Sequence, residues 1–393
     1  MNGKWLKTAG VILAVLGASV VVTLASSPYL RRWALLRGPD VYDYERLPAR
    51  TVPRGPEPLR LPAATTGDWL AALRLAHDGH PIARQAALDD FLAEHETTAF
   101  IVVKDGRLLA ERYFNGFARD SLFKSFSISK SVLSALIGIA LAEGRIESLD
   151  DPVTKYLPEM RDPAFARATL RHCLDGTAGI RYARGYMPWV PEPRMYYTTD
   201  VRGYLLGAVI EREPGQRFAA ENLSPLVLGY VLERALARDP SVPDIATYLS
   251  GKLWGPLGAE YDARWNLDRE RGGLEKTESG LSARAIDLTK FAVLYLQGGR
   301  WGSRQLVPAA WVAESTTMDA DERAPNQWES GFFKHQWWGR TVAGPGRPDF
   351  YANGHFGQRL YVSPRKNLVL VRMGRANAGV DWEGFLADVA RAF

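Results

Sequence analysis

Two pairs of short apolar runs, placed far apart along the chain, constrain the fold most strongly. Residues 100–103 and 108–113 flank Lys104-Asp105-Gly106, a turn with residues that tolerate positive φ. Residues 359–362 and 368–373 flank a second turn-rich segment near the other end. The sequence between the pairs is mostly helical in pattern. The sequence therefore predicts an α/β (α+β) fold in which both ends of the globular region form one antiparallel sheet, with flanking helices and a helical subdomain.

Further helices are expected at the two ends of this region. Helical patterns cover residues 69–77 and 82–95, before the first strand pair. Asp381 precedes an amphipathic pattern that runs to Phe393, and we expect it to cap this last helix.

The amino-terminal segment is strongly apolar. Residues 8–30 contain no charged side chain, and basic residues stand on both sides of them. This length suits a transmembrane helix or the apolar part of a signal peptide. We expect residues 1–33 to be a single-pass membrane anchor (or signal segment), which makes the membrane a partner and favours a periplasmic or otherwise extracytoplasmic domain. Residues 34–65, rich in Pro and Arg, are predicted to be a linker to a domain at residues 66–393.

Composition excludes several classes of protein. The net charge is +5 and the basic residues are scattered, so we expect no nucleic-acid partner. The single cysteine, Cys173, excludes an intrachain disulfide. The six histidines show no metal-binding spacing, and neither a Gly-x-Ser-x-Gly elbow nor a phosphate loop occurs. We expect no metal site.

The pattern Ser127-Ile128-Ser129-Lys130 suggests chemistry. It opens an almost wholly apolar helix over residues 131–142. A serine and a lysine three positions apart lie on one helix face, and burial would leave a neutral amine able to accept the serine proton. A second copy, Ser121 to Lys124, opens no such helix. Ser127 is therefore the preferred nucleophile.

The stretch SFSISKSVLSALIGIALAEGRIESLDDPVTKYLPE resembles the serine β-lactamase-like (penicillin-recognising) hydrolases. That family holds class C β-lactamases, D-Ala-D-Ala carboxypeptidases, esterases and 6-aminohexanoate-dimer hydrolases. The stretches RHCLDGTAGI, ESGLSARAIDLTKFAVLYLQGG and ANGHFGQRLYVSP extend the resemblance over about residues 100–374. The resemblance implies a β-lactamase-like fold, no cofactor, and an acyl-enzyme mechanism with Ser127 as nucleophile and Lys130 as base.

The family's third motif is matched by His355-Phe356-Gly357. The resemblance places this motif on the strand beside the nucleophile, where His355 would orient the substrate. An N–H at Gly357 and the N–H of Ser127 would stabilise the oxyanion.

The middle motif departs from the family pattern. Relatives show Tyr-x-Asn or Tyr-x-Ser, whereas this chain has Ala220-Glu221-Asn222. Asn222 can still hydrogen-bond the substrate. Tyr186 is the best single candidate for a replacement phenol, although for each nearby aromatic a role in the pocket wall is the preferred interpretation. The other candidates are Tyr182, Tyr196, Tyr197 and Glu221.

These observations predict a serine hydrolase acting on an ester or amide bond of a small molecule or short peptide. Carboxylesterase, 6-aminohexanoate-dimer hydrolase-like and β-lactamase or DD-peptidase-like activities all fit the motifs. The alternative is a catalytically impaired relative that binds peptidoglycan-like or peptide ligands, because the missing tyrosine is a general acid–base group that typically contributes about a hundredfold or more. Turnover of an acyl adduct distinguishes the two.

Overall fold

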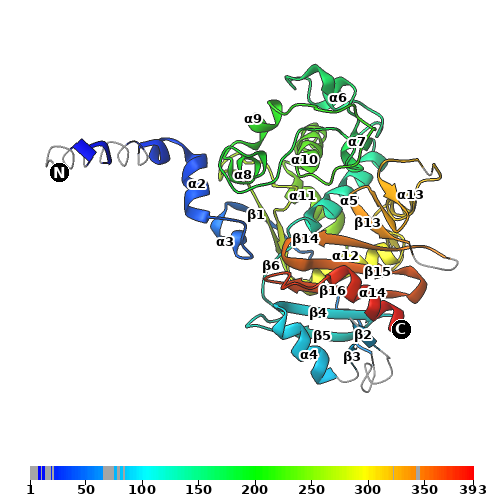
Figure 1. Cartoon of the computed structure of the whole chain (residues 1–393). Helices are drawn as coiled ribbons and strands as arrows, with labels where there is room; N and C mark the ends of the chain where they lie inside the picture. Colours follow the sequence, from blue (N-terminus) through cyan, green and yellow to red (C-terminus); the bar gives the residue numbers. More distant parts are fainter. Residues whose placement is uncertain are drawn as a thin grey trace.

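The chain folds around an eight-stranded antiparallel sheet in the order β11-β12-β13-β14-β15-β16-β4-β5 (Figure 1). This computed structural model describes residues 8–9, 11–13, 19, 22–64, 75–77, 80–82, 85–321, 323–341 and 346–393. The strands of the sheet are β4 (Thr97–Lys104), β5 (Arg107–Tyr113), β11 (Gln327–Trp328), β12 (Gly331–Lys334), β13 (Trp337–Arg340), β14 (Asp349–Gly354), β15 (Gln358–Ser363) and β16 (Leu368–Gly374).

The two ends of the globular region pair with each other within this sheet. Strand β16 pairs with β4, and Val371 lies opposite Ile101. Asp105 and Gly106, with φ of 52° and 74°, form the tight turn between β4 and β5. The predicted antiparallel sheet built from both ends of the chain is therefore confirmed.

Alternation along β4 gives the sheet two buried faces. Phe100 and Val102 point to one core, which helices α4 and α14 cover. Ile101 and Val103 point to the larger core, which contains helices α5 and α12. The helices next to the sheet are α4 (Gln85–Glu94), α5 (Ile128–Ala142), α12 (Ala285–Leu296) and α14 (Trp382–Ala392).

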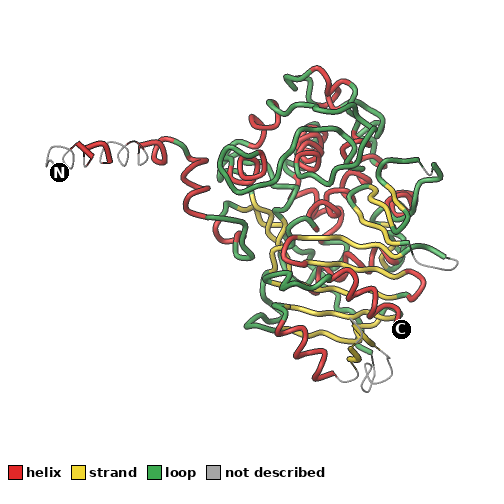
Figure 2. Tube along the Cα trace, in the orientation of Figure 1, coloured by secondary structure: helices red, strands yellow, loops and turns green. Residues whose placement is uncertain are grey.

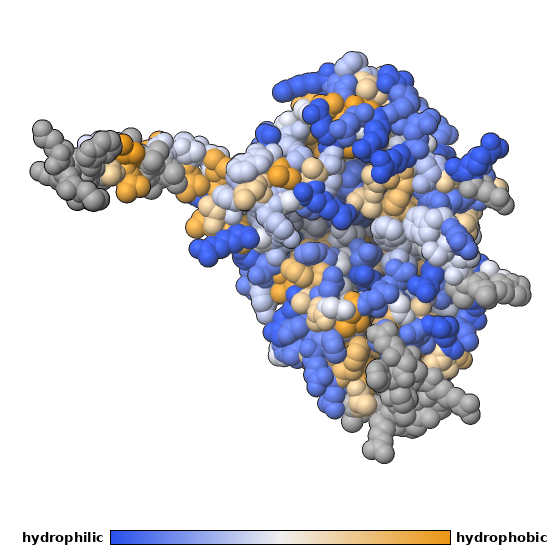
Figure 3. All heavy atoms as spheres, viewed as in Figure 1, coloured by the Kyte–Doolittle hydropathy of each residue, from blue (hydrophilic) through white to orange (hydrophobic). Residues whose placement is uncertain are grey.

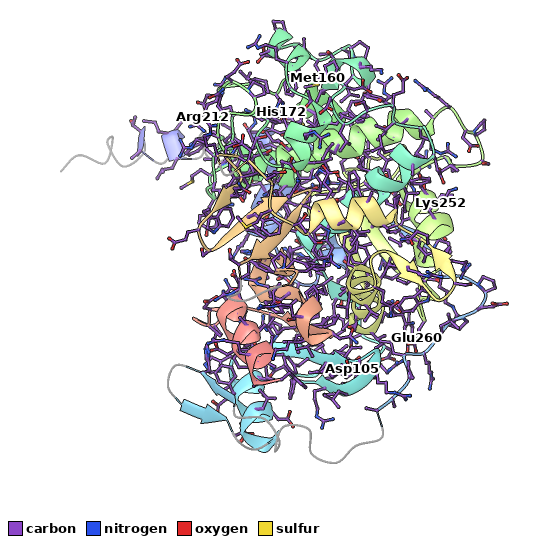
Figure 4. All side chains as sticks on the ribbon, turned by 90° about the vertical axis from the view of Figure 1, so that its right-hand side faces the viewer. Asp105, Met160, His172, Arg212, Lys252 and Glu260 are labelled. Atoms are coloured by element: carbon purple, nitrogen blue, oxygen red, sulfur yellow. The ribbon has the colours of Figure 1, made fainter. Side chains whose placement is uncertain are left out.

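A helical part lies beside the sheet, on the side of the larger core (Figure 2). Its elements are α6 (Val153–Tyr156), η1 (Pro163–Ala166), α7 (Leu170–Leu174), α8 (Pro191–Tyr197), α9 (Val201–Leu206), α10 (Leu223–Leu236), α11 (Ile245–Leu249) and the π-helical turn η2 (Ser250–Trp254). Figure 4 shows Met160 and His172 of this part near one end of the molecule, and Asp105 of the sheet near the other.

Smaller elements complete the fold. A second sheet has the strand order β1-β7-β8-β6, and its strand β6 ends a few residues before Ser127. Its strands are β1 (Ala49–Val52), β6 (Phe123–Lys124), β7 (Ala263–Asn266) and β8 (Leu281–Ala283). Other short elements are β2 (Leu75–His77), β3 (His80–Ile82), β9 (Arg300–Trp301), β10 (Arg304–Gln305), α13 (Ala309–Ser315), η3 (His355–Gly357) and η4 (Pro364–Lys366).

The helices expected at the ends of the globular region have different outcomes. Helix α4 lies within the predicted range 82–95. The helix predicted over 69–77 is wrong at residues 75–77, which form strand β2 paired with β3, and residues 69–74 lie outside the described part. Asp381 stands at the N-cap position of α14, but its side chain makes no capping hydrogen bond.

The predicted membrane anchor at residues 1–33 is contradicted. Within the described part of the chain, no helix has the length and apolar character that crossing a bilayer requires, although part of the predicted span lies outside that part. Helix α2 (Pro28–Leu36) packs on the globular body, where the Tyr29 hydroxyl donates to Pro188 O over 2.5 Å. The transmembrane and signal-anchor assignments and the extracytoplasmic location are therefore corrected, and the membrane partner has no support. Figure 3 shows hydrophobic side chains on the described part of the amino-terminal segment. Val11 and Val22 are among its exposed residues.

The segment for which the sequence predicts a linker contains structure of its own. Helix α3 (Asp43–Arg46) places the fully buried carboxylate of Asp43 against the hydroxyl of Tyr196. Asn266 Nδ2 donates to the carbonyls of Asp43 and Leu47, over 3.3 Å in each case. Strand β1 then pairs with β7. Residues 43–52 are therefore part of the packed body.

Candidate active site

Ser127 stands at the junction between strand β6 and helix α5. The buried residue before it, Phe126, has a φ of 48°, a conformation that is strained for a bulky side chain. Two hydrogen bonds hold this turn: Ser129 Oγ donates to Phe126 O over 2.6 Å, and Leu281 N donates to Ser129 Oγ over 2.9 Å. Ser127 occupies the N-cap position, yet its side chain makes no capping hydrogen bond. Its Oγ is therefore not engaged by the helix.

The turn between β14 and β15 packs directly against this junction. The Phe126 ring makes edge contacts with the rings of His355 and Phe356, at centroid separations of 5.6 and 5.4 Å. A Cβ added to Gly354 would lie 2.4 Å from the carbonyl oxygen of Ser125. Only glycine allows this approach of the two backbones. The strand edge and the start of α5 are thereby held together.

Lys130 lies one helical turn beyond Ser127, and both residues line one cavity. Its Nζ donates to Asn222 Oδ1 over 2.6 Å and to the carbonyl of Glu221 over 3.4 Å. Burial lowers the pKa of Lys130 to about 8, against the opposing charges of Glu221 and Glu278. A pKa this low makes the neutral amine available at mildly alkaline pH.

The start of helix α10 holds the partner of this lysine. The Glu221 carboxylate accepts hydrogen bonds from the backbone N–H groups of Leu223 and Ser224, the second over 2.9 Å. These bonds satisfy donors that a helix start leaves unpaired. Burial raises the pKa of Glu221. Asn222 follows at the N-cap, and its Nδ2 donates to the Tyr182 hydroxyl over 2.8 Å.

The His355-Phe356-Gly357 segment forms a 3-10 turn between β14 and β15, where the sequence predicted a strand. His355 lines the cavity, and partial burial lowers the pKa of its ring. Gly357 is not among the lining residues. A Cβ added to it would lie 2.4 Å from a guanidinium nitrogen of Arg372 and 2.6 Å from the Trp382 ring. The structure therefore brings His355 to the cavity, but not Gly357.

The candidate phenols lie in different environments. Tyr186 lines the cavity and is 85% exposed. Tyr196 and Tyr197 also line it and are buried. Tyr182 is not a lining residue, although its hydroxyl is hydrogen-bonded to the asparagine that binds Lys130. Ala220, at the position of the family tyrosine, lines the cavity.

Several lining residues carry no signal in the sequence. The cavity, of about 750 Å³, receives Trp33 and Arg37 from α2 and its C-cap. Trp33 Nε1 donates to the carbonyl of Tyr186 over 2.8 Å, so the amino-terminal helix braces the cavity wall. Glu192 of α8 and Arg359 of β15 also line it. These residues reach the site only through tertiary packing, and no sequence motif predicts their presence there.

The second Ser-x-x-Lys copy lies outside the cavity. Lys124 is buried, and its Nζ donates to Asn266 Oδ1 over 2.5 Å. Burial lowers the pKa of Lys124 to about 8. Ser121 Oγ accepts a hydrogen bond from Ala118 N over 2.9 Å, within a surface turn. Neither residue lines the cavity that contains Ser127.

Comparison with known proteins gives consistent results. The profile of the β-lactamase family matches residues 85–383. The 6-aminohexanoate-dimer hydrolase of Paenarthrobacter ureafaciens is 28% identical over 330 residues, which cover 78% of this chain and 81% of the relative. A solved structure from Bacillus anthracis, assigned to the same hydrolases, has a TM-score of 0.76 at 23% identity, and the match covers 92% of this chain and 94% of that one. EstCE1, a hydrolase with promiscuous acyltransferase activity, has a TM-score of 0.61 at 18% identity, over 78% of this chain and 95% of its own. These two structures share the fold.

Proposed function

Because the chain belongs to the β-lactamase family, we propose that it is a serine hydrolase that cleaves an ester or amide through an acyl-enzyme on Ser127. One observation carries this proposal. Ser127, whose side chain the helix leaves uncapped, shares a cavity with Lys130, whose pKa is lowered to about 8. A neutral lysine beside a serine supplies the proton acceptor that nucleophilic attack requires.

In acylation, neutral Lys130 accepts the Ser127 proton while Oγ attacks the substrate carbonyl. The backbone N–H of Ser127 and an N–H of the β14–β15 turn stabilise the oxyanion. His355 orients the substrate, and Asn222 holds the lysine. The protonated lysine gives this proton to the leaving group, either directly or by relay through a phenol such as Tyr186. Water then attacks the acyl-enzyme and releases the product.

The substrate class follows from the cavity and the relatives. A volume of about 750 Å³ is within the range of sites for small molecules. The Paenarthrobacter relative is named for the 6-aminohexanoate dimer, whose units are joined by an amide bond, and EstCE1 is described as a hydrolase with acyltransferase activity. Small esters, linear amides and short peptides are the substrates we propose.

Ala220 favours a second candidate function. It leaves the cavity without the phenol that relatives carry at this position. A protein that acylates slowly, or not at all, would bind peptidoglycan-like or peptide ligands without turning them over.

Steady-state hydrolysis by the full chain separates the two functions. The substrates are p-nitrophenyl butyrate, a linear aminohexanoate amide and a penicillin, each tested on the wild type and on Ser127→Ala. Repeated turnover of at least one substrate, lost in the variant, supports the hydrolase. Saturable binding of a peptide or penicillin without turnover of any substrate supports the binding protein instead.

A further inference from the structure

The hydrogen bonds around Lys130 continue beyond the cavity wall as a directed chain. Lys130 Nζ donates to Asn222 Oδ1 over 2.6 Å, and Asn222 Nδ2 donates to the Tyr182 hydroxyl over 2.8 Å. Burial raises the pKa of this hydroxyl, and the charge and hydrogen bonding of Glu192 raise it further, which places that carboxylate beside the phenol. Glu192 Oε2 is itself held by the backbone N–H of Gly185 over 3.1 Å. This chain of hydrogen bonds therefore runs from α5, through α10, to the first turn of α8.

The outer end of this chain fixes the direction of every bond. A carboxylate oxygen accepts the hydrogen bond of a phenol, so the Tyr182 hydrogen is directed to Glu192. The phenol oxygen is then left as an acceptor, and it binds the Nδ2 group of Asn222. An asparagine without such a partner presents either end of its amide. Here the amide must turn Oδ1 toward Lys130.

This orientation decides what the lysine can do. A neutral amine has two N–H groups and one lone pair. Two acceptors, Asn222 Oδ1 and the carbonyl of Glu221, take the two N–H groups of Lys130. The lone pair is left for the cavity, which Ser127 lines one turn away. A flipped amide would donate to that lone pair and occupy it.

We propose that Tyr182 and Glu192 are positioning residues that fix the amide orientation of Asn222. Through this amide they direct the lone pair of Lys130 toward Ser127. The inference rests on the proposed hydrolase function and deepens it, because it gives a role to two residues outside the recognised motifs. Neither residue acts on the reacting atoms, so their loss should lower the rate of the chemical step more than substrate binding.

The two positions give different pH signatures. The charged groups that face Lys130 are Glu221, Glu278 and Glu192, which raise its pKa, and Arg184, which lowers it. Glu192→Gln removes one of the raising charges, so the alkaline rise in activity should move to lower pH. Tyr182→Phe leaves that charge in place, so the rise should stay where it is. The shift in Glu192→Gln follows from its charge alone, so a fall in kcat with little change in KM is the result that distinguishes positioning from a merely structural role.

The experiment measures kcat and kcat/KM against pH for p-nitrophenyl butyrate, using the full chain. Tyr230→Phe is the matched control, because the Tyr230 hydroxyl donates to Glu159 over 2.9 Å and this phenol–carboxylate pair is not part of the cavity. We expect kcat to fall by a factor of about 10 to 100 in Tyr182→Phe and in Glu192→Gln, as for other residues that orient a catalytic group. The control should stay within about twofold of the wild type.

The possible failures can be told apart. If both variants match Tyr230→Phe in kcat, the positioning role is wrong, while wild-type turnover leaves the hydrolase proposal standing. If the wild type neither turns over nor forms an adduct with a fluorophosphonate, both proposals fail. Should Tyr182→Phe not fold, the isosteric Glu192→Gln carries the test alone.

Discussion

At the scale of single residues, the chemistry depends on keeping one lysine neutral. Burial removes the solvation of the charged amine and lowers the pKa of Lys130, whereas nearby carboxylates raise this pKa. The balance places its pKa at about 8, far below the value of an exposed lysine. Its hydrogen-bond acceptors are a side-chain amide and a backbone carbonyl, neither of which carries a full charge. The site therefore favours proton acceptance over a permanent ion pair.

The first prediction is a rise of activity with pH. Only the neutral form of Lys130 can accept the Ser127 proton, so kcat/KM should increase as pH passes through the lysine pKa of about 8 and level off above it. The pH dependence of p-nitrophenyl ester hydrolysis measures this. A rate that is flat from pH 6 to pH 9 would show that another group takes the proton.

A second prediction concerns the identity of the base. Lys130→Arg keeps the charge and the hydrogen-bonding nitrogens, but a guanidinium is never deprotonated in proteins. We expect kcat/KM to fall by about 10²- to 10⁴-fold, the usual contribution of a general base. Lys155→Arg is the control, since Lys155 pairs with Glu147 and Asp151 on the surface. Equal activity of the two variants would exclude Lys130 as the base.

At the scale of secondary-structure elements, the site depends on the contact between the β14–β15 turn and the start of α5. Gly354 allows the backbones to approach, and Phe126 is wedged between the turn and the helix. The strand pairs could be predicted from the sequence, because alternation and turn residues are local signals. The placement of His355 and Gly357 could not, because it depends on how η3 packs on Arg372 and Trp382.

The third prediction tests this contact. In Gly354→Ala the new methyl group would meet the Ser125 carbonyl at 2.4 Å, so the turn must move away from the start of α5. We expect the free energy of unfolding to fall by about 1–3 kcal/mol. Esterase activity should also fall, even under conditions in which the variant is folded, because the turn that lines the site has moved. Urea unfolding and ester hydrolysis measure the two. Gly251→Ala is the control, since nothing lies within 4 Å of its Cβ position; identical behaviour of both variants would contradict the account.

At the scale of the whole molecule, the residues that follow the apolar amino-terminal stretch are part of the folded body. Residues 28–52 supply α2, α3 and β1, and the cavity wall includes Trp33. The composition of this region indicated an anchor and a linker. It could not reveal the packing, because apolar and Pro-rich stretches carry no information about contacts with residues that are distant in the sequence. The same limit applies to the site. Motifs named Ser127, Lys130, Asn222 and His355, which the structure brings to one cavity, whereas the contribution of Glu192 requires the tertiary fold.

The fourth prediction compares two truncations. A chain that begins at Ser27 keeps α2 and its cap, so its melting temperature should stay within about 2 °C of the full chain. A chain that begins at Arg54 loses β1 and the carbonyls that bind the buried amide of Asn266. Unsatisfied buried groups and an unpaired strand should lower its melting temperature by at least about 10 °C or prevent folding. Differential scanning fluorimetry compares them, and equal stability would mean that residues 28–53 are dispensable.

Intact-mass analysis after incubation with a fluorophosphonate tests whether Ser127 is the nucleophile that becomes acylated. The full chain, Ser127→Ala and Ser121→Ala should be compared, since Ser121 belongs to the second Ser-x-x-Lys copy outside the cavity. We expect a single adduct on the full chain and on Ser121→Ala, and none on Ser127→Ala. An adduct that persists in Ser127→Ala, or one that disappears in Ser121→Ala, would contradict this expectation.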